Sequence, residues 1–312
     1  MRRVSGLAAA GLAALVAASA FIVGWRMAGQ AAQAPGSERL TVALTAAHAS
    51  YFSPTRLAEV SGANVDVSEA ISGTTEAGDP AIDVWDVSTS VYDTTNHRPL
   101  EPMSRTLVFD RTTAELINCC GQSVNGNGLI WQSGIAGWVF PAGTRKQTYD
   151  VFDTVLDEPE PFAYSGPAMV DGIAAYRFTE NISPAFVGFS PLSADEPELY
   201  SARRVSWVDP ETGAVLRVTE DEDLYLVNPA TSAPLRQLFD ANLSTTPAAV
   251  ARLASADARV RREIALAGAL RILFLCVAGA FAVAAGCLLA RRPRLGRHRR
   301  HRLPPPALAG EQ

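Results

Sequence analysis

The sequence is poor in the residues and motifs that enzymes use. Its 312 residues include four histidines and four cysteines, and only two of each lie in the long middle of the chain. It has no G-x-S-x-G, no H-E-x-x-H, no glycine-rich phosphate loop and no spaced pair of cysteines. His48 and His97 have no partner at a ligand spacing. We therefore expect no enzyme activity, no cofactor and no metal site.

Lysine is almost absent, and the charges are unevenly distributed. Lys146 is the single lysine, while arginine is abundant, a bias that is typical of GC-rich bacterial genomes. Between Met27 and Arg262 the chain has 30 acidic and 16 basic residues, and both chain ends are rich in arginine. An acidic middle excludes nucleic-acid binding by that part, and the basic ends favour contact with an anionic membrane surface.

Charge is missing altogether from Ile272 to Ala290, a run of nineteen residues. A helix of this length, rising about 1.5 Å per residue, nearly matches a hydrocarbon core of about 30 Å. Seven arginines follow between Arg291 and Arg302. A buried core helix is the alternative, but the dense basic flank favours a transmembrane helix that ends in the cytoplasm.

A second uncharged stretch, Val4 to Trp25, follows Arg2 and Arg3. A cleaved signal peptide is one interpretation, with Ala32-Gln33-Ala34 as the cleavage site, but apolar regions of signal peptides span only about 7–15 residues. The greater length favours an uncleaved anchor. Positive charge at both ends then predicts a two-pass plasma-membrane protein with both termini in the cytoplasm and the main domain outside.

The predicted fold class is a β-rich (α+β) extracytoplasmic domain flanked by two transmembrane α-helices. Residues 1–29 form the N-terminal anchor, 30–246 the β-rich domain, 247–271 a juxtamembrane helix, 272–290 the C-terminal transmembrane helix, and 291–312 a basic cytoplasmic tail. Thr246 suits an N-cap and Pro247 a first helical turn, so we expect a helix that continues without a break into the second span.

The middle of the chain shows strand periodicity and hairpin turns. Trp85, Val87, Thr89 and Val91 alternate with polar residues, as in a half-buried strand. Asp171-Gly172 lies between apolar runs and predicts a two-residue hairpin. The segments 108–116 and 207–216 have nearly the same layout, which we interpret as two hairpins with similar turns rather than a duplication. The acidic run 220–223 is expected to be a solvated strand end.

Cys119 and Cys120 are the cysteines outside the predicted spans. In an oxidising compartment such a pair forms a disulfide. Adjacent Cα atoms are about 3.8 Å apart, below the usual disulfide range of about 4.4–6.8 Å, so the bridge would be a rigid turn. A structural turn is one interpretation, and a redox switch or recognition element is the other.

Glycines alternate with large apolar residues between Gly121 and Gly143. One interpretation is a pair of core strands joined by glycine-rich turns. The other is a mobile apolar loop that faces lipid or a ligand. For the second interpretation the predicted ligand-contact residues are Leu129, Ile130, Trp131, Trp138 and Phe140.

The segment from Phe109 to Gly121, FDRTTAELINCCG, resembles a signature of the actinobacterial PorA-like porin family. Gly143–Tyr149, Asp171–Phe178 and Trp207–Gly213 resemble further blocks of that family, and the resemblance covers roughly residues 38 to 292. Ala114 stands where the family has a turn glycine. The resemblance implies a membrane permeability protein and carries over no catalytic residues.

The function that we expect is non-enzymatic. The first hypothesis is that the outer domain binds or conveys an apolar ligand, such as an envelope lipid. The second is a channel of the porin type, and the third is an envelope assembly or interaction protein. The expected partners are the lipid bilayer, an apolar ligand and, since small residues recur every four positions from Ala278 to Ala290, a second membrane helix or a homo-oligomer.

Overall fold

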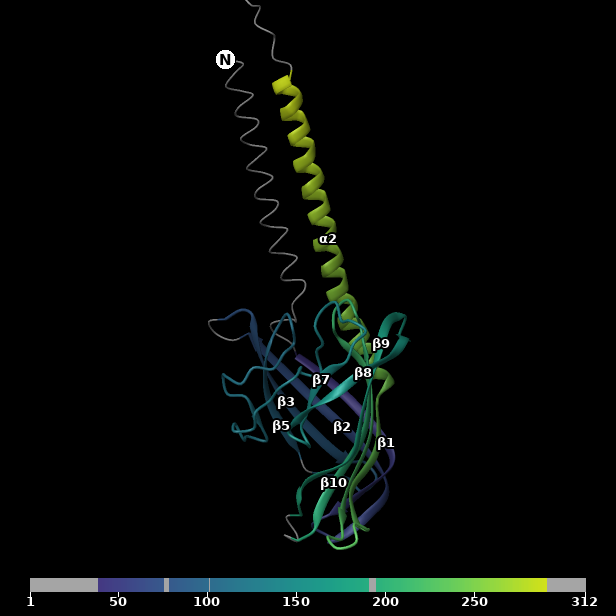
Figure 1. The fold of residues 1–312 in the computed structure, drawn as a ribbon. Helices are drawn as coiled ribbons and strands as arrows, with labels where there is room; N and C mark the ends of the chain where they lie inside the picture. Colours follow the sequence, from purple (N-terminus) through teal and green to yellow (C-terminus); the bar gives the residue numbers. More distant parts are fainter. Residues whose placement is uncertain (1–38, 76–78, 101, 191–194, 291–312) are drawn as a thin grey trace, which may run out of the picture. The chain divides into compact units, whose positions relative to one another are not determined.

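The computed structural model describes residues 39–75, 79–100, 102–190 and 195–290. Its centre is one curled antiparallel sheet in which the strand order is β6-β5-β3-β2-β1-β12-β11-β10-β9-β8-β7, with β4 paired to β3 (Figure 1). The strands are β1 (Arg39–Ser53), β2 (Ala58–Thr75), β3 (Ile82–Asp93), β4 (Arg98–Pro99), β5 (Met103–Asp110), β6 (Ser123–Val124), β7 (Tyr149–Asp153), β8 (Glu158–Val170), β9 (Ile173–Phe189), β10 (Pro197–Val208), β11 (Val215–Val227) and β12 (Pro234–Thr245).

The strand and hairpin predictions are confirmed. In β3, Trp85 and Val87 are buried while Asp86 between them is exposed, because alternate side chains point to opposite faces of a strand. Val170 pairs with Ile173 across Asp171-Gly172, and both turn residues have positive φ. This is the geometry of a two-residue hairpin turn.

The turns within 108–116 and 207–216, which have similar sequences, belong to a set of five turns with the same hydrogen bonding. Five residues at strand ends each accept backbone N–H hydrogen bonds from residues two or three positions later: Asp93, Asp110 and Asp153 are the last residues of their strands, and Asp209 and Asn228 directly follow theirs. The fourth residue after each of them, respectively His97, Ala114, Asp157, Gly213 and Ser232, has positive φ. The same arrangement, an Asp or Asn side chain that accepts backbone N–H bonds and a residue of positive φ four positions later, thus forms five turns with different sequences.

Ala114 occupies a left-handed turn position at which the matching turn after β10 has a glycine. Its φ of 59° lies in the left-handed region, close to the 78° of Gly213 in the matching turn. Alanine could not replace Gly213, because a Cβ there would overlap the carbonyl of Phe140, which packs directly against the glycine. The same turn therefore tolerates alanine at one site and requires glycine at the other.

The two edges of the curled sheet are joined by the loop that follows β5. Leu116 N–H donates to the Gly134 carbonyl at 2.8 Å, and Ile135 N–H donates to the Asp150 carbonyl of β7 at 2.8 Å. Ile135 thus bridges the β5 side to the β7 side. Gly134 has a φ of 81°, and a Cβ on it would overlap the Asp150 carbonyl. A glycine is therefore needed where the two edges meet.

Helix α2 (Pro247–Ala290) begins directly after β12. Ala249 N–H donates to the Thr246 hydroxyl at 3.2 Å, so the predicted N-cap is confirmed. The helix runs unbroken through the predicted juxtamembrane and membrane segments, and it is long and apolar enough to cross a membrane. The predicted N-terminal anchor (1–29) and the basic tail (291–312) lie outside the described residues.

The first part of α2 belongs to the same compact unit as the sheet, which extends to Ala267. Leu253 and Ala254 are buried, and Asp257 is 2% exposed. The carboxyl of Asp257 accepts a hydrogen bond from the Thr212 hydroxyl, and the neighbouring carboxyl of Asp209 raises its pKa. Arg261 lies 3.3 Å from Asp209 and 3.1 Å from Glu211. The β10–β11 turn therefore holds the base of the helix through a buried pair of carboxyl groups.

The buried carboxyl pair of Asp209 and Asp257 makes the free energy of unfolding depend on pH. Burial and the neighbouring carboxyl of Asp209 raise the pKa of Asp257 to about 7, although the Thr212 hydroxyl and Arg261 act to lower it. An acid whose folded-state pKa lies above its unfolded value of about 4 binds its proton more tightly when folded, so stability falls as the pH rises from about 4 to about 7.

We predict that Asp257→Asn, which imitates the protonated acid, stabilises the full-length protein at pH 8 by about 1–3 kcal/mol and has little effect at pH 5. The measurement is thermal unfolding in detergent micelles followed by tryptophan fluorescence. Exposed Asp171→Asn, in the β8–β9 turn, is the matched control. A stabilisation that is equal at both pH values would contradict the assignment.

Candidate functional site

The concave face of the curled sheet is layered, and β10 shows the layers most simply. Val208 and Ser206 are buried at the end nearest α2, Arg204 lies in the middle, and Ala202 and Tyr200 are buried beyond it. All five alternate with outward-facing residues. A charged layer therefore crosses an otherwise apolar concave face.

Arg204 is the centre of this layer. Its guanidinium lies 3.0 Å from Glu180 of β9, 3.4 Å from Asp153 of β7 and 3.9 Å from Glu222 of β11, and it donates from Nε to Glu220 of β11. The two neighbouring strands β9 and β11 and the end of β7 thus direct four carboxyl groups at one arginine. Such an arrangement stabilises the buried cation, but it leaves an excess of negative charge.

The excess of negative charge is reduced when carboxyl groups of the layer bind protons. Burial, together with the neighbouring Glu220 carboxylate, raises the pKa of Glu222 to about 8 in spite of Arg204. Burial also raises the pKa of Glu180 to about 7, against the lowering influence of Arg204. For Arg204 burial would lower the pKa, but Glu220, Glu180 and the other acids outweigh it and raise the pKa. The layer therefore holds protons near neutral pH.

A second arginine and a glutamate extend the layer to the opposite wall. Burial and the negative charge of Glu220 raise the pKa of Glu69 on β2 to about 8. Burial lowers the pKa of Arg105 on β5 to about 10. Arg105 Nε donates to the Gln132 side chain at 2.7 Å, and its guanidinium lies 4.9 Å from the centre of the Phe152 ring. Glu69 and Arg105 complete a polar belt across the concave face.

Gln132 connects this belt to the loop that carries the adjacent cysteines. Gln132 is 1% exposed and donates from its side chain to the Thr106 carbonyl at 3.1 Å. Its backbone exchanges two hydrogen bonds with the Asn118 side chain, at 2.8 and 2.6 Å. Asn118 also accepts a bond from Gln122. The loop is thereby attached to Arg105 through one buried amide.

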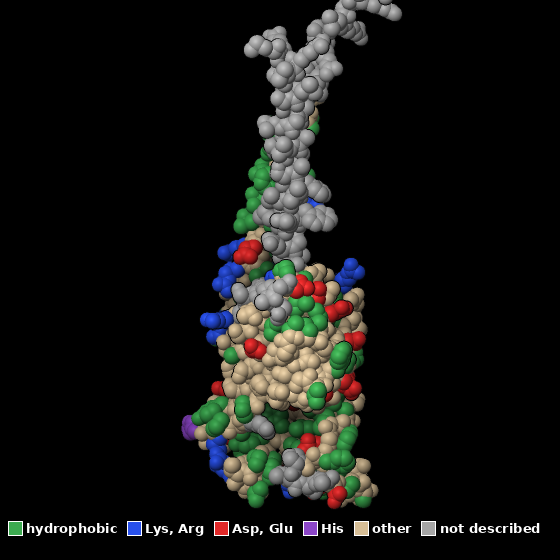
Figure 2. All heavy atoms as spheres, turned by 90° about the vertical axis from the view of Figure 1, so that its left-hand side faces the viewer, with side chains coloured by type: hydrophobic (Ala, Val, Ile, Leu, Met, Phe, Trp, Pro, Cys, Tyr) green, Lys and Arg blue, Asp and Glu red, His purple; other side chains and the backbone are tan. Residues whose placement is uncertain are grey.

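The concave face is not filled on the side of Arg204 away from the packed core. The side chains of Arg204, Glu220 and Glu222 remain 18–20% exposed although strands surround them. Beyond them Ile182, Tyr200 and Ala202 form a small apolar cluster against which five residues are only partly buried: Val155, Leu156, Ala185, Val187 and Leu224. Figure 2 shows a hollow in the lower half of the sheet unit, lined by hydrophobic side chains with acidic ones beside it.

The other side of the layer is closed by aromatic packing. Phe140 stacks on Phe178 with ring centres 5.2 Å apart, and Tyr149 meets both rings edge-on at 5.4 and 5.6 Å. Phe109, Phe140 and Phe178 are at most 1% exposed. The end of the concave face nearest α2 is therefore packed core, whereas the opposite end is hollow.

The predicted ligand-contact residues do not lie together in one environment. Phe140 is core, and Trp138 packs partly buried against the core. Leu129 is 94% and Trp131 72% exposed, with Ile130 partly buried between them. The interpretation of this segment as two core strands is wrong, because its regular structure is limited to the two residues of β6. Its contact with a ligand remains a prediction.

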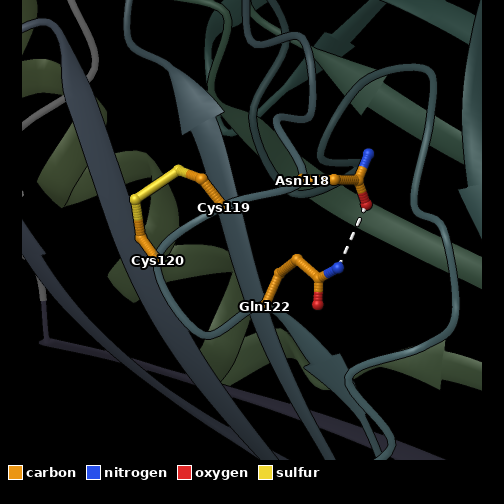
Figure 3. The surroundings of a disulfide bond; sticks show 4 residues. All are labelled: Asn118, Cys119, Cys120 and Gln122. Atoms are coloured by element: carbon orange, nitrogen blue, oxygen red, sulfur yellow. Dashed lines mark hydrogen bonds between the residues drawn. A yellow bond between two sulfur atoms is a disulfide. The ribbon is translucent and has the colours of Figure 1, made fainter.

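Cys119 and Cys120 form the predicted disulfide between adjacent residues, with a Cα–Cα distance of 3.8 Å. Cys120 has a φ of 60°, so the bridge is combined with a left-handed turn. Figure 3 shows the two sulfur atoms on the side of the loop opposite the hydrogen-bonded amides of Asn118 and Gln122. The disulfide thus tightens the outer edge of a loop whose inner edge is bound to Gln132.

Sequence reasoning missed the charged layer. It placed the acidic run 220–223 at a solvated strand end, but the run alternates across β11, so that Glu220 and Glu222 point to Arg204. Asp221 is exposed on the other face. The alternation of side chains and the predicted hairpin at 207–216 were the available signals, because Arg204, sixteen residues before Glu220, is its direct cross-strand partner in that hairpin. Among the described residues no group suited to a metal ion occurs.

We predict that Arg204→Gln destabilises the protein by about 3–5 kcal/mol at pH 8, because four carboxyl groups lose their cation. The loss should be smaller at pH 5, where those groups can be protonated. Arg203→Gln is the matched control, because Arg203 is the adjacent exposed residue and should change stability by less than about 0.5 kcal/mol. Unfolding of both variants at the two pH values is the measurement, and a pH-independent loss for Arg204→Gln would contradict the assignment.

Comparison with known proteins places the chain in a family. A family model described as Porin PorA matches residues 5–288, which is most of the chain. No curated protein matches it. The match includes the curled sheet, the charged layer, the disulfide loop and nearly all of α2. The chain therefore belongs to the Porin PorA family.

Proposed function

We propose that this protein is a non-enzymatic, membrane-anchored member of the cell envelope whose curled sheet binds an apolar or amphiphilic ligand, such as an envelope lipid. The observation that carries the proposal is the unfilled half of the concave face. Partly buried apolar side chains line it, and partly exposed charged side chains bound it on one side. Cores of folded domains are normally packed without such space, and ligand sites are apolar with a few polar groups.

The charged layer would contact the polar end of the ligand. Glu69, Glu180 and Glu222 offer oxygen atoms that accept hydrogen bonds, and one oxygen of Glu180 has no hydrogen-bond partner among the described residues. The apolar part of the ligand would lie against Ile182, Tyr200 and Ala202. This division matches an amphiphile with one polar end.

A permeability function is the second candidate, since the chain belongs to a porin family and the sheet is curled. Passage straight through the concave face of one copy would be obstructed by Phe109, Phe140 and Phe178, which are packed at the α2 end. Binding and carriage of a ligand in the hollow at the opposite end is therefore favoured over a continuous pore. An assembly role in the envelope would require a protein partner.

The proposed setting is an actinobacterial plasma membrane. One helix of sufficient length and apolarity, α2, supports membrane association. In this proposal a second anchor precedes the sheet, both termini are cytoplasmic and the sheet unit is outside, since arginines flank both apolar runs of the sequence.

We predict that the full-length protein, purified in mild detergent, retains an amphiphile that solvent extraction and mass spectrometry identify. Ala185 lies partly buried in the hollow opposite Tyr200. Ala185→Trp should fill the space and lower ligand occupancy at least fivefold. Ser183→Trp, at an exposed position of the same strand, should leave occupancy unchanged.

Planar-bilayer recording with the same preparation distinguishes the second candidate. Stable unitary conductance that Ala185→Trp abolishes would favour permeation. A purified protein that retains no amphiphile and whose two tryptophan variants behave alike would refute ligand binding in the hollow.

A further inference from the structure

A groove of about 320 Å³ lies on the outer face of the sheet, where it crosses β8, β9, β10 and β11. Its lining consists of Ser165, Arg177, Thr179, Arg203, Val205, Trp207 and Thr219. Arg203 and Arg204 are consecutive in a strand and therefore point to opposite faces. The groove is thus separated from the hollow by the thickness of the sheet, and it needs an explanation of its own.

The lining is unusual because all of its charges have one sign. It contains two arginines and three hydroxyl side chains but no carboxylate. Between Met27 and Arg262 acidic residues outnumber basic ones by 30 to 16. A purely cationic, hydrogen-bond-donating groove in so acidic a segment is opposite to what composition predicts. Its chemistry is that of a site for an anion.

Arg177 is held in place before any ligand binds. Its Nε donates to the Ser165 hydroxyl at 3.2 Å, and one terminal nitrogen donates to the Ser165 carbonyl at 2.9 Å. The Ser165 and Thr179 hydroxyls are 2.9 Å apart. Gly166, with a φ of 131°, lies at the register shift of β8 that places Ser165 there. A fixed guanidinium loses less conformational freedom when it binds an anion.

Two further arginines add charge to the groove. Arg217 lies with its guanidinium 4.8 Å from the centre of the Trp207 ring, which forms part of the lining. Arg203 is exposed and forms no ion pair or hydrogen bond through its side chain among the described residues. Asp221 is its cross-strand neighbour and lies outside the lining. The free guanidinium of Arg203 is therefore available to a ligand.

We propose that this groove binds a phosphate-type oxyanion, either as a free phosphate compound or as the head group of an anionic lipid. Planar guanidinium groups match the geometry of phosphate oxygens and can donate two parallel hydrogen bonds. The threonine and serine hydroxyls supply further donors. A tetrahedral anion has enough oxygen atoms to accept from several of these donors at once, whereas a carboxylate has two.

The test measures binding of inorganic phosphate and of soluble dihexanoyl phosphatidylglycerol to the full-length protein in neutral detergent at low ionic strength. We expect saturable binding that Arg203→Gln weakens about tenfold, since a charge-assisted contact is lost. Arg236→Gln is the matched control, because Arg236 lies over the Phe52 ring on the β1 side of β12, away from the groove. Asp221→Asn should strengthen binding by removing the adjacent negative charge.

The two ligands distinguish the sources of the anion. Binding of the phospholipid at least tenfold tighter than inorganic phosphate, with no binding of dihexanoyl phosphatidylcholine, identifies a lipid head group. Comparable binding of phosphate and phospholipid identifies a site for free phosphate compounds. Absence of saturable binding of either anion, or equal binding by the Arg203→Gln and Arg236→Gln variants, overturns the proposal. Ligand retention in the hollow is measured separately and does not depend on this result.

Discussion

The ion pairs of Arg204 are the interaction on which the concave face depends. One guanidinium is held by carboxyl groups from β7, β9 and β11, so the charge can be buried only when these strands are in register. Removing Arg204 would leave four carboxyl groups in the interior without their cation. The apolar packing of Phe140 and Phe178 on one side and the hollow on the other are separated by this layer.

The loop after β5 allows the sheet to stay curled. Gly134 and Ile135 join the two edges by backbone hydrogen bonds, which removes part of the unpaired edge that an open sheet would expose. Gln132 attaches the same loop to Arg105 of the charged layer. The Cys119–Cys120 turn is thus part of the support of the layer, and a change in the loop has a direct route to the polar belt.

Adjacent residues of β10 serve different faces of the molecule. Arg204 is enclosed by acids, and its charge is used to hold the strands together. Arg203 is exposed beside a groove without carboxylates. The alternation of side chains in a strand is enough to separate an interior structural cation from an exterior one that is available for binding. The two proposed ligand sites, of opposite electrostatic character, therefore share one strand.

Local features were determined by the sequence alone: the alternation in β3, the Asp171-Gly172 hairpin, the Thr246 cap and the apolar run in α2 all follow from interactions between residues close in the chain. Tertiary structure decided the rest. Glycines between 121 and 143 interrupt any periodicity, so only packing could bury Phe140 while leaving Trp131 exposed. Glu180 and Glu220 face Arg204 because β9 and β11 pair directly with β10. Asp153 of β7 and the charged residues Glu69 and Arg105 come from strands farther away, and only the curling of the sheet brings them to the same layer.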